Sequence, residues 1–192
     1  MEKVFCESKM NNLLEEHRLR ANSSYDFLEA ANWYVLYTKS RHEKFVEERL
    51  NEIGIEAFTP KRKIERAWSD RVRVIEEPVF KSYCFAKFPL NNRIDILSQK
   101  GVVNIVHFGE QYISIPESVI NSLEIVLENQ LKLSPYPYLK IGDRVVVKRG
   151  PLKGLEGFLI GKRKKNTKMV ISVDVIASSA MCVVDGDFVD VA

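Results

Sequence analysis

Cysteine and histidine are scarce in this chain of 192 residues, which has three of each. The cysteines are Cys6, Cys84 and Cys182. They are far apart and form no Cys-x-x-Cys pair, so the sequence favours neither a disulfide framework nor a zinc site, and a reducing compartment is expected. The histidines lie in separate segments, and the sequence has no nucleophile motif, phosphate-binding loop or metal-ligand cluster. We therefore expect neither an enzyme nor a cofactor.

Long apolar runs are also missing. No stretch approaches the roughly 20 apolar residues that span a bilayer, and the first thirty residues are charged throughout, unlike a signal peptide. Hydrophobic residues make up 45% of the chain and charged residues 29%, a balance typical of a soluble globular protein with a core. We therefore expect a cytoplasmic protein without a membrane contact. The net charge is only +3, but the residues from Lys140 onward carry +4 and the remainder −1.

Secondary structure is expected to begin after a polar extension over residues 1–31. Residues 33–38 are aromatic and β-branched, which predicts a strand. Ser40 and Glu43 have the spacing of a capping box, which predicts the start of a helix. Apolar residues then follow at helical spacing as far as Gly54, which suits a left-handed helix end.

The next segments predict more strands. Residues 55–64 and 71–75 flank a Ser-Asp turn signal, which indicates a hairpin. Alternation within a strand over residues 79–88 places Tyr83 and Phe85 on one face and smaller side chains such as Cys84 on the other.

The last part of the N-terminal domain combines two helices with one strand. We expect a short helix capped by Asn91 or Asn92, a strand over residues 102–108, and a helix behind a second capping box at Ser114 and Glu117. The predicted fold class is α+β, with a split βαβ antiparallel sheet over residues 32–129 and its helices mainly on one face.

The C-terminal part predicts a small five-stranded β-barrel over residues 140–192, after a proline-containing linker over residues 130–139. Its valines and isoleucines favour strands. Its five glycines before residue 162 and Pro151 would together cost roughly 8 kcal/mol in a helix interior. We therefore expect a barrel in the free protein, flexibly attached, with no helices from this region covering the N-terminal domain.

Residues 141–157 (IGDRVVVKRGPLKGLEG) combine a strand, a tight Gly-Pro turn and glycines that permit a backbone path closed to other residues. This stretch closely resembles a KOW motif, a module of an SH3-like barrel. The turn residues of the motif are Gly150, Pro151, Gly154 and Gly157.

The N-terminal domain resembles those of the NusG family. Residues 33–37 (WYVLY) are similar to the opening strand, and residues 77–86 (EPVFKSYCFA) to the signature strand, although Lys81 and Ser82 stand in place of the usual Pro-Gly pair. Residues 101–109 and 115–120 complete the resemblance, and parts of both are closer to the specialised RfaH-like branch. The resemblance implies a transcription elongation factor that binds the clamp coiled coil of RNA polymerase and promotes processive elongation or antitermination on particular operons.

The resemblance places the polymerase-binding surface on the aromatic face of the signature strand and on the last helix. Its residues are Phe80, Tyr83, Phe85, Ile120 and Leu123. Helices over the other face of the sheet would leave this face exposed, and exposed apolar patches mark binding sites. The alternative interpretation is that these side chains form part of the core.

Basic residues crowd the start of the first helix, where the helix N-terminus adds partial positive charge. They are Lys39, Arg41, Lys44 and the neighbouring His42. In RfaH-like proteins this edge meets the non-template DNA strand of the transcription bubble; the alternative is a solvated helix end. Arg71 and Arg73 in the hairpin are further candidates, and the basic residues 162–165 fit RNA, a ribosomal surface or a solvated turn.

Val175 and Ile176 match the strand through which the barrel of the family binds a second partner, either the termination factor Rho or a small-subunit ribosomal protein. This sequence departs from the usual pattern there, with Ile176 in place of phenylalanine and Ser178 in place of arginine. A ribosome-associated or RNA-binding KOW protein is the alternative function. The Lys/Arg-Gly-Phe-type string of RNA-binding split βαβ folds is missing, which disfavours it. A monomer is expected.

Overall fold

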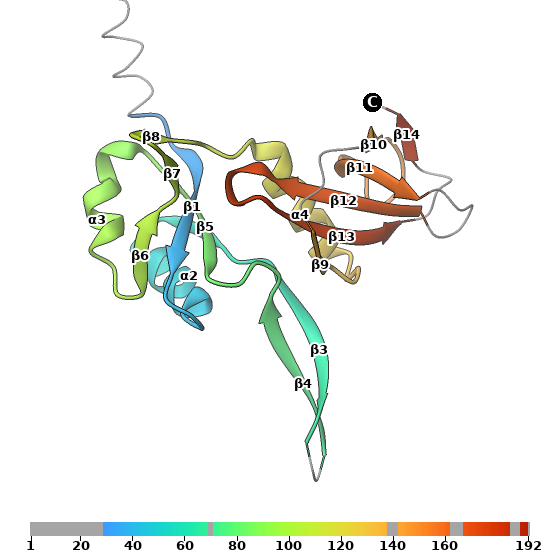
Figure 1. The fold of residues 1–192 in the computed structure, drawn as a ribbon, viewed down its shortest axis with the longest axis horizontal. Helices are drawn as coiled ribbons and strands as arrows, with labels where there is room; N and C mark the ends of the chain where they lie inside the picture. The colour runs from blue at the N-terminus through green and yellow to red at the C-terminus, as the bar shows by residue number, and fades with distance from the viewer. Residues whose placement is uncertain (1–28, 69–70, 138–141, 162–166, 185–188, 192) are drawn as a thin grey trace, which may run out of the picture.

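The computed structural model describes residues 29–68, 71–137, 142–161, 167–184 and 189–191 (Figure 1). The predicted extension over residues 1–31 lies almost wholly outside the described residues. An N-terminal α+β part and a C-terminal β part lie side by side, and a long two-stranded hairpin projects from the first of them. No helix within the described ranges is both long and apolar enough to cross a membrane.

The N-terminal part contains a four-stranded antiparallel sheet in the order β2-β5-β1-β6. Its strands are β1 (Asn32–Thr38), β2 (Glu56–Phe58), β5 (Tyr83–Phe88) and β6 (Val102–Ile105). The shorter elements beside it are α2 (Glu43–Glu52), η1 (Leu90–Asn92), α3 (Arg93–Leu97), β7 (His107–Phe108) and β8 (Gln111–Tyr112). The predicted α+β class with a mainly antiparallel sheet is confirmed.

Strand alternation divides the sheet into two faces as predicted. Cys84, Ala86 and Phe88 pack in one apolar cluster with Val46 and Leu50 of α2. Side chains of the opposite parity in β1 and β5, among them Val35, Tyr83 and Phe85, pack in a second cluster. Burial raises the pKa of the Cys84 thiol to about 12, so this side chain stays uncharged at neutral pH and serves as a small apolar group.

The strand predicted over residues 55–64 is in fact two strands, because Thr59 and Pro60 interrupt it. The second of them, β3 (Lys61–Ala67), pairs with β4 (Val72–Pro78) in the predicted hairpin. The strand predicted over residues 79–88 begins only at Tyr83, since Val79 and Phe80 lie in a buried turn.

Neither predicted capping box forms. α2 begins at Glu43 with His42 as its N-cap, and α4 (Glu117–Glu128) begins after Pro116; no side-chain cap hydrogen bond is present at either start. Arg41 adopts a left-handed backbone (φ 63°), which turns Ser40 away from the helix. Glu117 forms an ion pair with Lys87 over 2.8 Å instead of bonding back to its own cap.

The C-terminal part is a curled antiparallel sheet in the order β14-β10-β11-β12-β13-β9. The strands are β9 (Ser134–Pro137), β10 (Asp143–Val147), β11 (Glu156–Gly161), β12 (Thr167–Val173), β13 (Ser178–Val184) and β14 (Val189–Val191), with η2 (Asp174–Ile176) between β12 and β13. The predicted β class of this part and its five predicted strands, β10 to β14, are confirmed, and β9 adds a sixth strand to the sheet. Within the segment predicted as a linker, Leu133 is buried and β9 pairs with β13, so its two prolines sit in extended chain at a sheet edge.

The glycines of the KOW-like turn have the predicted role. Gly150 (φ 80°) and Gly154 (φ 95°) take left-handed conformations that reverse the chain after β10. The Gly154 N–H then donates to the Val147 carbonyl oxygen over 2.9 Å. Gly157 meets a steric requirement, because a Cβ there would lie 2.7 Å from the Val170 carbonyl oxygen.

Candidate binding surfaces

The aromatic face of the N-terminal sheet is covered for most of its width. Phe80 and Phe85 are buried, with ring centroids 5.8 Å apart in an edge-to-face arrangement. They share one apolar cluster with Ile120 and Leu123 of α4 and with side chains of the barrel. The expectation that this face lies open is therefore wrong for the arrangement seen here, because α4 packs on it and the barrel packs on α4.

One end of the same face stays accessible. Tyr37 of β1 and Tyr83 of β5 are cross-strand partners whose ring centroids lie 5.7 Å apart. Tyr37 is 44% exposed and Tyr83 is half-buried. Among the described residues, this is the only aromatic ring pair on this face in which neither ring is fully buried.

Polar and apolar contacts join α4 to the barrel. The backbone N–H of Glu156 in β11 donates to the Ser122 hydroxyl over 2.9 Å, and the Asn129 side chain donates to the Pro151 carbonyl oxygen over 3.2 Å. A Cβ on Gly154 would lie 3.6 Å from the Ile125 side chain, which shows how closely the KOW-like turn approaches the helix. The helix α4 therefore lies at the interface between the two parts of the molecule.

Helix geometry assigns the two sides of α4 to different neighbours. At 3.6 residues per turn, Ser122, Ile125 and Asn129 lie along one side of the helix, the side that contacts the barrel. Ile120 and Leu123 lie toward the opposite side, and both are fully buried. These two predicted polymerase-binding residues belong to the same apolar cluster as Val35 and Phe85 of the sheet.

The turn before β5 shows how this chain replaces the Pro-Gly pair of the family. Ser82 takes a left-handed backbone (φ 64°), a conformation that glycine adopts without strain. Its N–H donates to the carboxylate of Glu43 over 2.7 Å. Glu43 is buried, so the carboxylate that the sequence assigned to a helix cap instead fixes the turn that leads into the aromatic strand.

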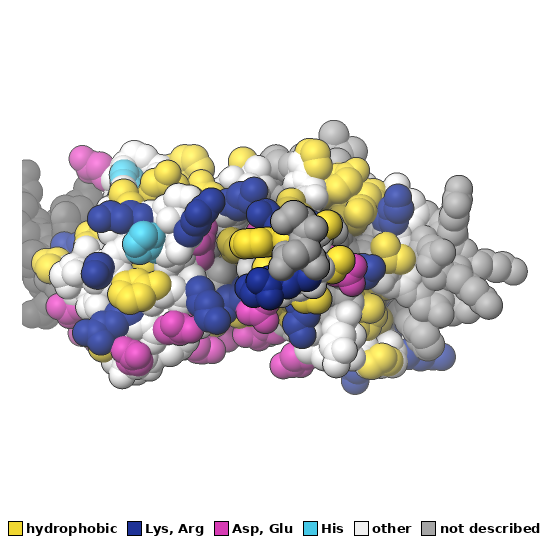
Figure 2. All heavy atoms as spheres, turned by 90° about the horizontal axis from the view of Figure 1, so that it is seen from below, with side chains coloured by type: hydrophobic (Ala, Val, Ile, Leu, Met, Phe, Trp, Pro, Cys, Tyr) yellow, Lys and Arg dark blue, Asp and Glu magenta, His cyan; other side chains and the backbone are white. Residues whose placement is uncertain are grey.

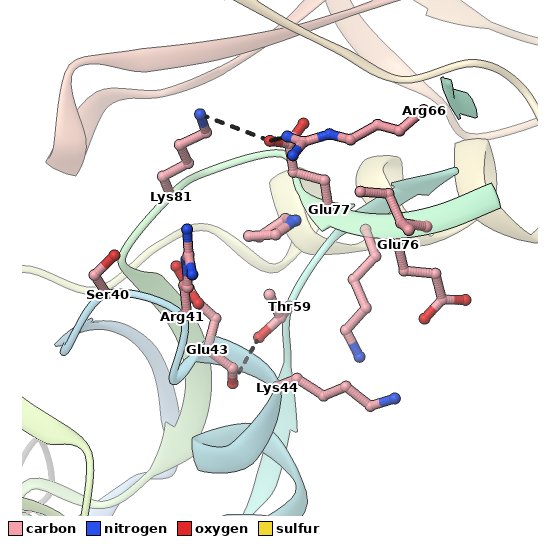
Figure 3. A pocket seen from close by; sticks show the side chains of 12 residues that line it. Ser40, Arg41, Glu43, Lys44, Thr59, Arg66, Glu76, Glu77 and Lys81 are labelled. Atoms are coloured by element: carbon pink, nitrogen blue, oxygen red, sulfur yellow. Dashed lines mark hydrogen bonds and ion pairs between the residues drawn. The ribbon is translucent and has the colours of Figure 1, made fainter. Parts of the chain in front are cut away.

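A cavity of about 590 Å³ opens between the start of α2, the base of the hairpin and the turn before β5 (Figure 3). Five cationic side chains line it: Arg41, Lys44, Lys61, Arg66 and Lys81. Three carboxylates, Glu43, Glu76 and Glu77, also line it, and Lys81 lies 3.7 Å from Glu77. The cavity is therefore a mixed but mainly basic recess, of a kind that accepts a phosphate or a nucleotide.

Glu77 is the main counter-charge of this recess. Its carboxylate accepts a hydrogen bond from Arg62 over 2.8 Å and lies 3.7 Å from Arg66. The hydrogen bond from Arg62, ahead of the charges of Lys81, Arg62 and Arg66, holds the pKa of the Glu77 carboxyl below its ordinary value. The carboxylate thus stays ionised and fixes the base of the hairpin.

The structure brings the four predicted DNA-binding residues together at the start of α2, over residues 39–44. Arg41 and Lys44 line the cavity, whereas Lys39 lies outside its lining and is exposed. His42 is half-buried, with Nδ1 3.0 Å from the Ser40 carbonyl oxygen and its ring against Phe45.

The predicted partner-binding residues of the barrel lie in η2. Val175 is buried and Ile176 is half-buried, and both belong to or pack against the cluster that joins the barrel to α4 and the sheet. The basic residues 162–165 lie outside the described residues. Arg71 and Arg73 are exposed on the projecting hairpin.

Three residues of these surfaces, Tyr37, Ser122 and Asn129, were not among the predicted site residues. Tyr37 shares strand parity with Trp33 and Val35, so the alternation used for β5 would have placed it beside Tyr83. Ser122 and Asn129 lie about two turns apart, within α4 and at its C-cap, and the helix has several other polar residues, so no local signal marks these two as contacts with the barrel.

Residues 31–124 match the family model described as transcription termination factor NusG. These residues form a NusG-family domain. The matched stretch, called the NusG domain below, includes the four-stranded sheet, the projecting hairpin and the first part of α4. The KOW-like stretch lies beyond the matched residues.

Two solved structures resemble most of the chain, more loosely. A Thermotoga maritima NusG structure, reported for the interaction of its domains, has 18% identity and a TM-score of 0.46, and the match covers 85% of this chain and 98% of that one. The MjSpt4:Spt5 complex has 14% identity and a TM-score of 0.28, covering 83% of this chain and 96% of the other. No curated protein sequence matches the chain.

Proposed function

We propose that this chain is a cytoplasmic transcription elongation factor that binds the clamp coiled coil of RNA polymerase through its NusG domain and promotes processive elongation on particular operons. The observation that carries the proposal is the NusG match, together with the accessible pair of Tyr37 and Tyr83 on the aromatic face of that domain. Tyrosines of this kind supply a large apolar contact with a polar rim, as at many protein-interface hot spots. The operon-specific role is supported by the similarity of residues 107–109 and 115–120 to RfaH-like proteins.

The docked barrel limits the surface that a clamp helix can reach. Phe80 and Phe85 are buried, and the barrel occupies the side of α4 that carries Ser122 and Asn129. A clamp helix therefore meets the tyrosine pair first, and a wider contact along α4 requires the barrel to leave. The apparent affinity for polymerase is then reduced by the fraction of molecules in which the barrel is docked.

The basic start of α2 is the proposed contact for the non-template DNA strand. Arg41 and Lys44 lie at the edge of the cavity, where a phosphate would gain both their charge and that of the helix N-terminus. The proposed partner of the barrel, Rho or a ribosomal protein, would reach Val175 and Ile176 only after the same movement, because Val175 is buried in this arrangement.

Polymerase binding by the full chain tests the proposal. The Tyr37→Ala/Tyr83→Ala double variant should bind purified core RNA polymerase about 30-fold more weakly, the equivalent of about 2 kcal/mol for a lost aromatic hot spot. Phe108→Ala is the control, because Phe108 is an aromatic residue that is 58% exposed on β7, outside the proposed surface. Equal affinities for the double variant and the wild type would contradict the proposed surface. A wild-type chain that neither binds polymerase nor shortens pauses in single-round elongation would contradict the function.

A further inference from the structure

The hairpin of β3 and β4 exposes more apolar surface than its own packing explains. It projects from the NusG domain as a two-stranded ribbon (Figure 1). Trp68 is 58% exposed and Val74 is 63% exposed. A lone two-stranded hairpin gains little stability in water, so a large aromatic side chain held near its tip points to a contact with something else.

Strand register sorts the side chains of the ribbon onto two faces. Pairs such as Arg66↔Arg73 and Ile64↔Ile75 put even-numbered residues of β3 on the same face as odd-numbered residues of β4. That face, here called the arginine face, carries Arg62, Arg66, Trp68, Arg71, Arg73 and Glu77. The opposite face carries Lys61, Lys63, Glu65 and Glu76 with two valines, so its charges cancel.

Among the described residues of the arginine face, Glu77 is the one carboxylate, and it lies at the base of the hairpin. Glu77 pairs there with Arg62 and Arg66, whereas Arg71 and Arg73 lie toward the other end of the ribbon. Near the tip the guanidinium of Arg73 lies 5.7 Å from the centroid of the Trp68 ring. This cation–π contact steadies the ring and places a phosphate-binding group beside it.

The arginine face continues into the basic cavity. Arg66 belongs to both, because its side chain lines the cavity together with Arg41 and Lys44. In Figure 2, which views the molecule from below in Figure 1, Lys and Arg side chains gather around the centre of the picture and over the face to its left. A nucleic-acid strand bound at the start of α2 would therefore meet further positive charge along the hairpin.

We propose that the arginine face of the β3–β4 hairpin binds a single-stranded segment of nucleic acid, with Trp68 stacked on an unpaired base and Arg71 and Arg73 on the flanking phosphates. An exposed tryptophan beside arginines fits unpaired bases, because every base presents a π-face and stacking needs no particular sequence. A duplex keeps its bases stacked on one another, so it offers Trp68 no such partner. This site acts on nucleic acid directly and does not depend on polymerase binding.

The test measures binding of the full chain to a labelled 12-nucleotide oligodeoxythymidylate by fluorescence anisotropy at several salt concentrations. Trp68→Ala should weaken binding roughly tenfold, in line with the loss of one base–aromatic stack, and Trp68→Phe should restore most of it. The Arg71→Gln/Arg73→Gln variant should reduce the slope of log K against log salt by about 1.4, since two phosphate contacts to a single strand are lost. Tryptophan fluorescence gives a second readout: Trp33 is buried, so quenching on binding reports Trp68.

Matched controls lie on the opposite face of the same hairpin. Val74→Thr and Lys63→Gln should change neither the affinity by more than about twofold nor the quenching. An effect of Lys63→Gln equal to that of an arginine substitution would overturn the proposal in favour of non-specific charge. Tighter binding to a duplex of the same length, with no effect of Trp68→Ala, would also overturn it. An oligouridylate arm identifies RNA or DNA as the preferred strand, and the Tyr37→Ala/Tyr83→Ala variant should bind both oligonucleotides like wild type.

Discussion

The Ser122 hydroxyl on α4 accepts a hydrogen bond from the Glu156 backbone N–H in β11 over 2.9 Å and donates one to the Ser118 carbonyl oxygen over 2.7 Å. Ser122 is buried, so neither partner regains a water molecule while the barrel is docked. A single side chain thus links the helix of the NusG domain to the barrel backbone.

Ser122→Ala should loosen this link without unfolding either part. The substitution leaves the Glu156 N–H without its acceptor, and a lost hydrogen bond of this kind costs about 1 to 3 kcal/mol. We expect the Glu156 amide to exchange its hydrogen at least about fivefold faster, measured by NMR. Ser118→Ala is the control, because the Ser118 carbonyl oxygen that Ser122 uses stays in place. Equal protection of Glu156 in all three proteins would show that the hydrogen bond does not hold the barrel.

Weakening the barrel side of the same contact should strengthen polymerase binding. Leu152 is half-buried against the shared cluster, in the turn whose Pro151 carbonyl oxygen binds Asn129. Leu152→Asp would place a charge in that contact and should raise polymerase affinity several-fold, because fewer molecules remain closed. Val183→Asp, at a residue that is 40% exposed on β13, should leave the affinity unchanged. A weaker complex with Leu152→Asp would indicate that the docked form is the one that binds.

Gly157 and Gly161 provide a matched pair within β11. A Cβ at Gly157 would meet the Val170 carbonyl oxygen at 2.7 Å, whereas a Cβ at Gly161 meets nothing within 4 Å among the described residues. Gly157→Ala should therefore destabilise the barrel by about 1 to 3 kcal/mol and Gly161→Ala by much less. Urea unfolding followed by circular dichroism measures both. Similar urea midpoints for the two variants would mean that β11 and β12 move apart at Gly157 with little loss of stability.

Three cations at the start of α2 should set the salt dependence of binding to a transcription bubble. Replacing Lys39, Arg41 and Lys44 with glutamine should weaken binding and flatten the slope of log K against log salt by about 2, at roughly 0.7 for each contact to a single strand. A variant with Lys100, Lys132 and Lys168 replaced has the same net charge, and these exposed residues lie elsewhere in the fold. Equal slopes for the two triple variants would favour a solvated helix end.

The base of the hairpin should respond to pH through Glu77. The pKa of its carboxyl is lowered in the folded chain, so the ionised group stabilises the fold above its unfolded pKa of about 4.3, and this stabilisation is lost as pH falls through the folded value. Glu77→Gln should destabilise the fold at pH 7, and the difference between the two proteins should shrink as pH falls from the unfolded pKa of about 4.3 toward the lowered folded value. Thermal unfolding from pH 3 to pH 7 measures this, with the exposed neighbour Glu76→Gln as the control. A difference that does not shrink at all between pH 7 and pH 3 would show that packing, rather than charge, is responsible.

Local patterns predicted most of the fold, because they depend on near neighbours. The alternation that separates Tyr83 and Phe85 from Cys84 follows from strand geometry alone, and the structure keeps it. The β-branched residues and glycines of the barrel likewise specify strands and turns locally. These features required no knowledge of what lies across the fold.

Long-range contacts account for the errors. Glu43 fits a capping box, but its carboxylate binds the Ser82 N–H from 39 positions away, an interaction that no local pattern contains. The aromatic face was expected to be open because the sequence does not show that a barrel packs on the far side of α4. The contact between Ser122 and Glu156 spans 34 positions and depends on how two separate folds meet.

The pairing of β9 with β13 sets the length of free chain over which the barrel can move away from α4. α4 ends at Glu128 and β9 begins at Ser134, so a barrel that keeps β9 is tethered by residues 129–133 alone. Five extended residues reach about 17 Å. A barrel on so short a tether can move only a short distance from the C-terminal end of α4. It therefore remains at high effective concentration near its docking site. A wider excursion requires β9 to separate from β13, which would expose the edge of that strand to a partner.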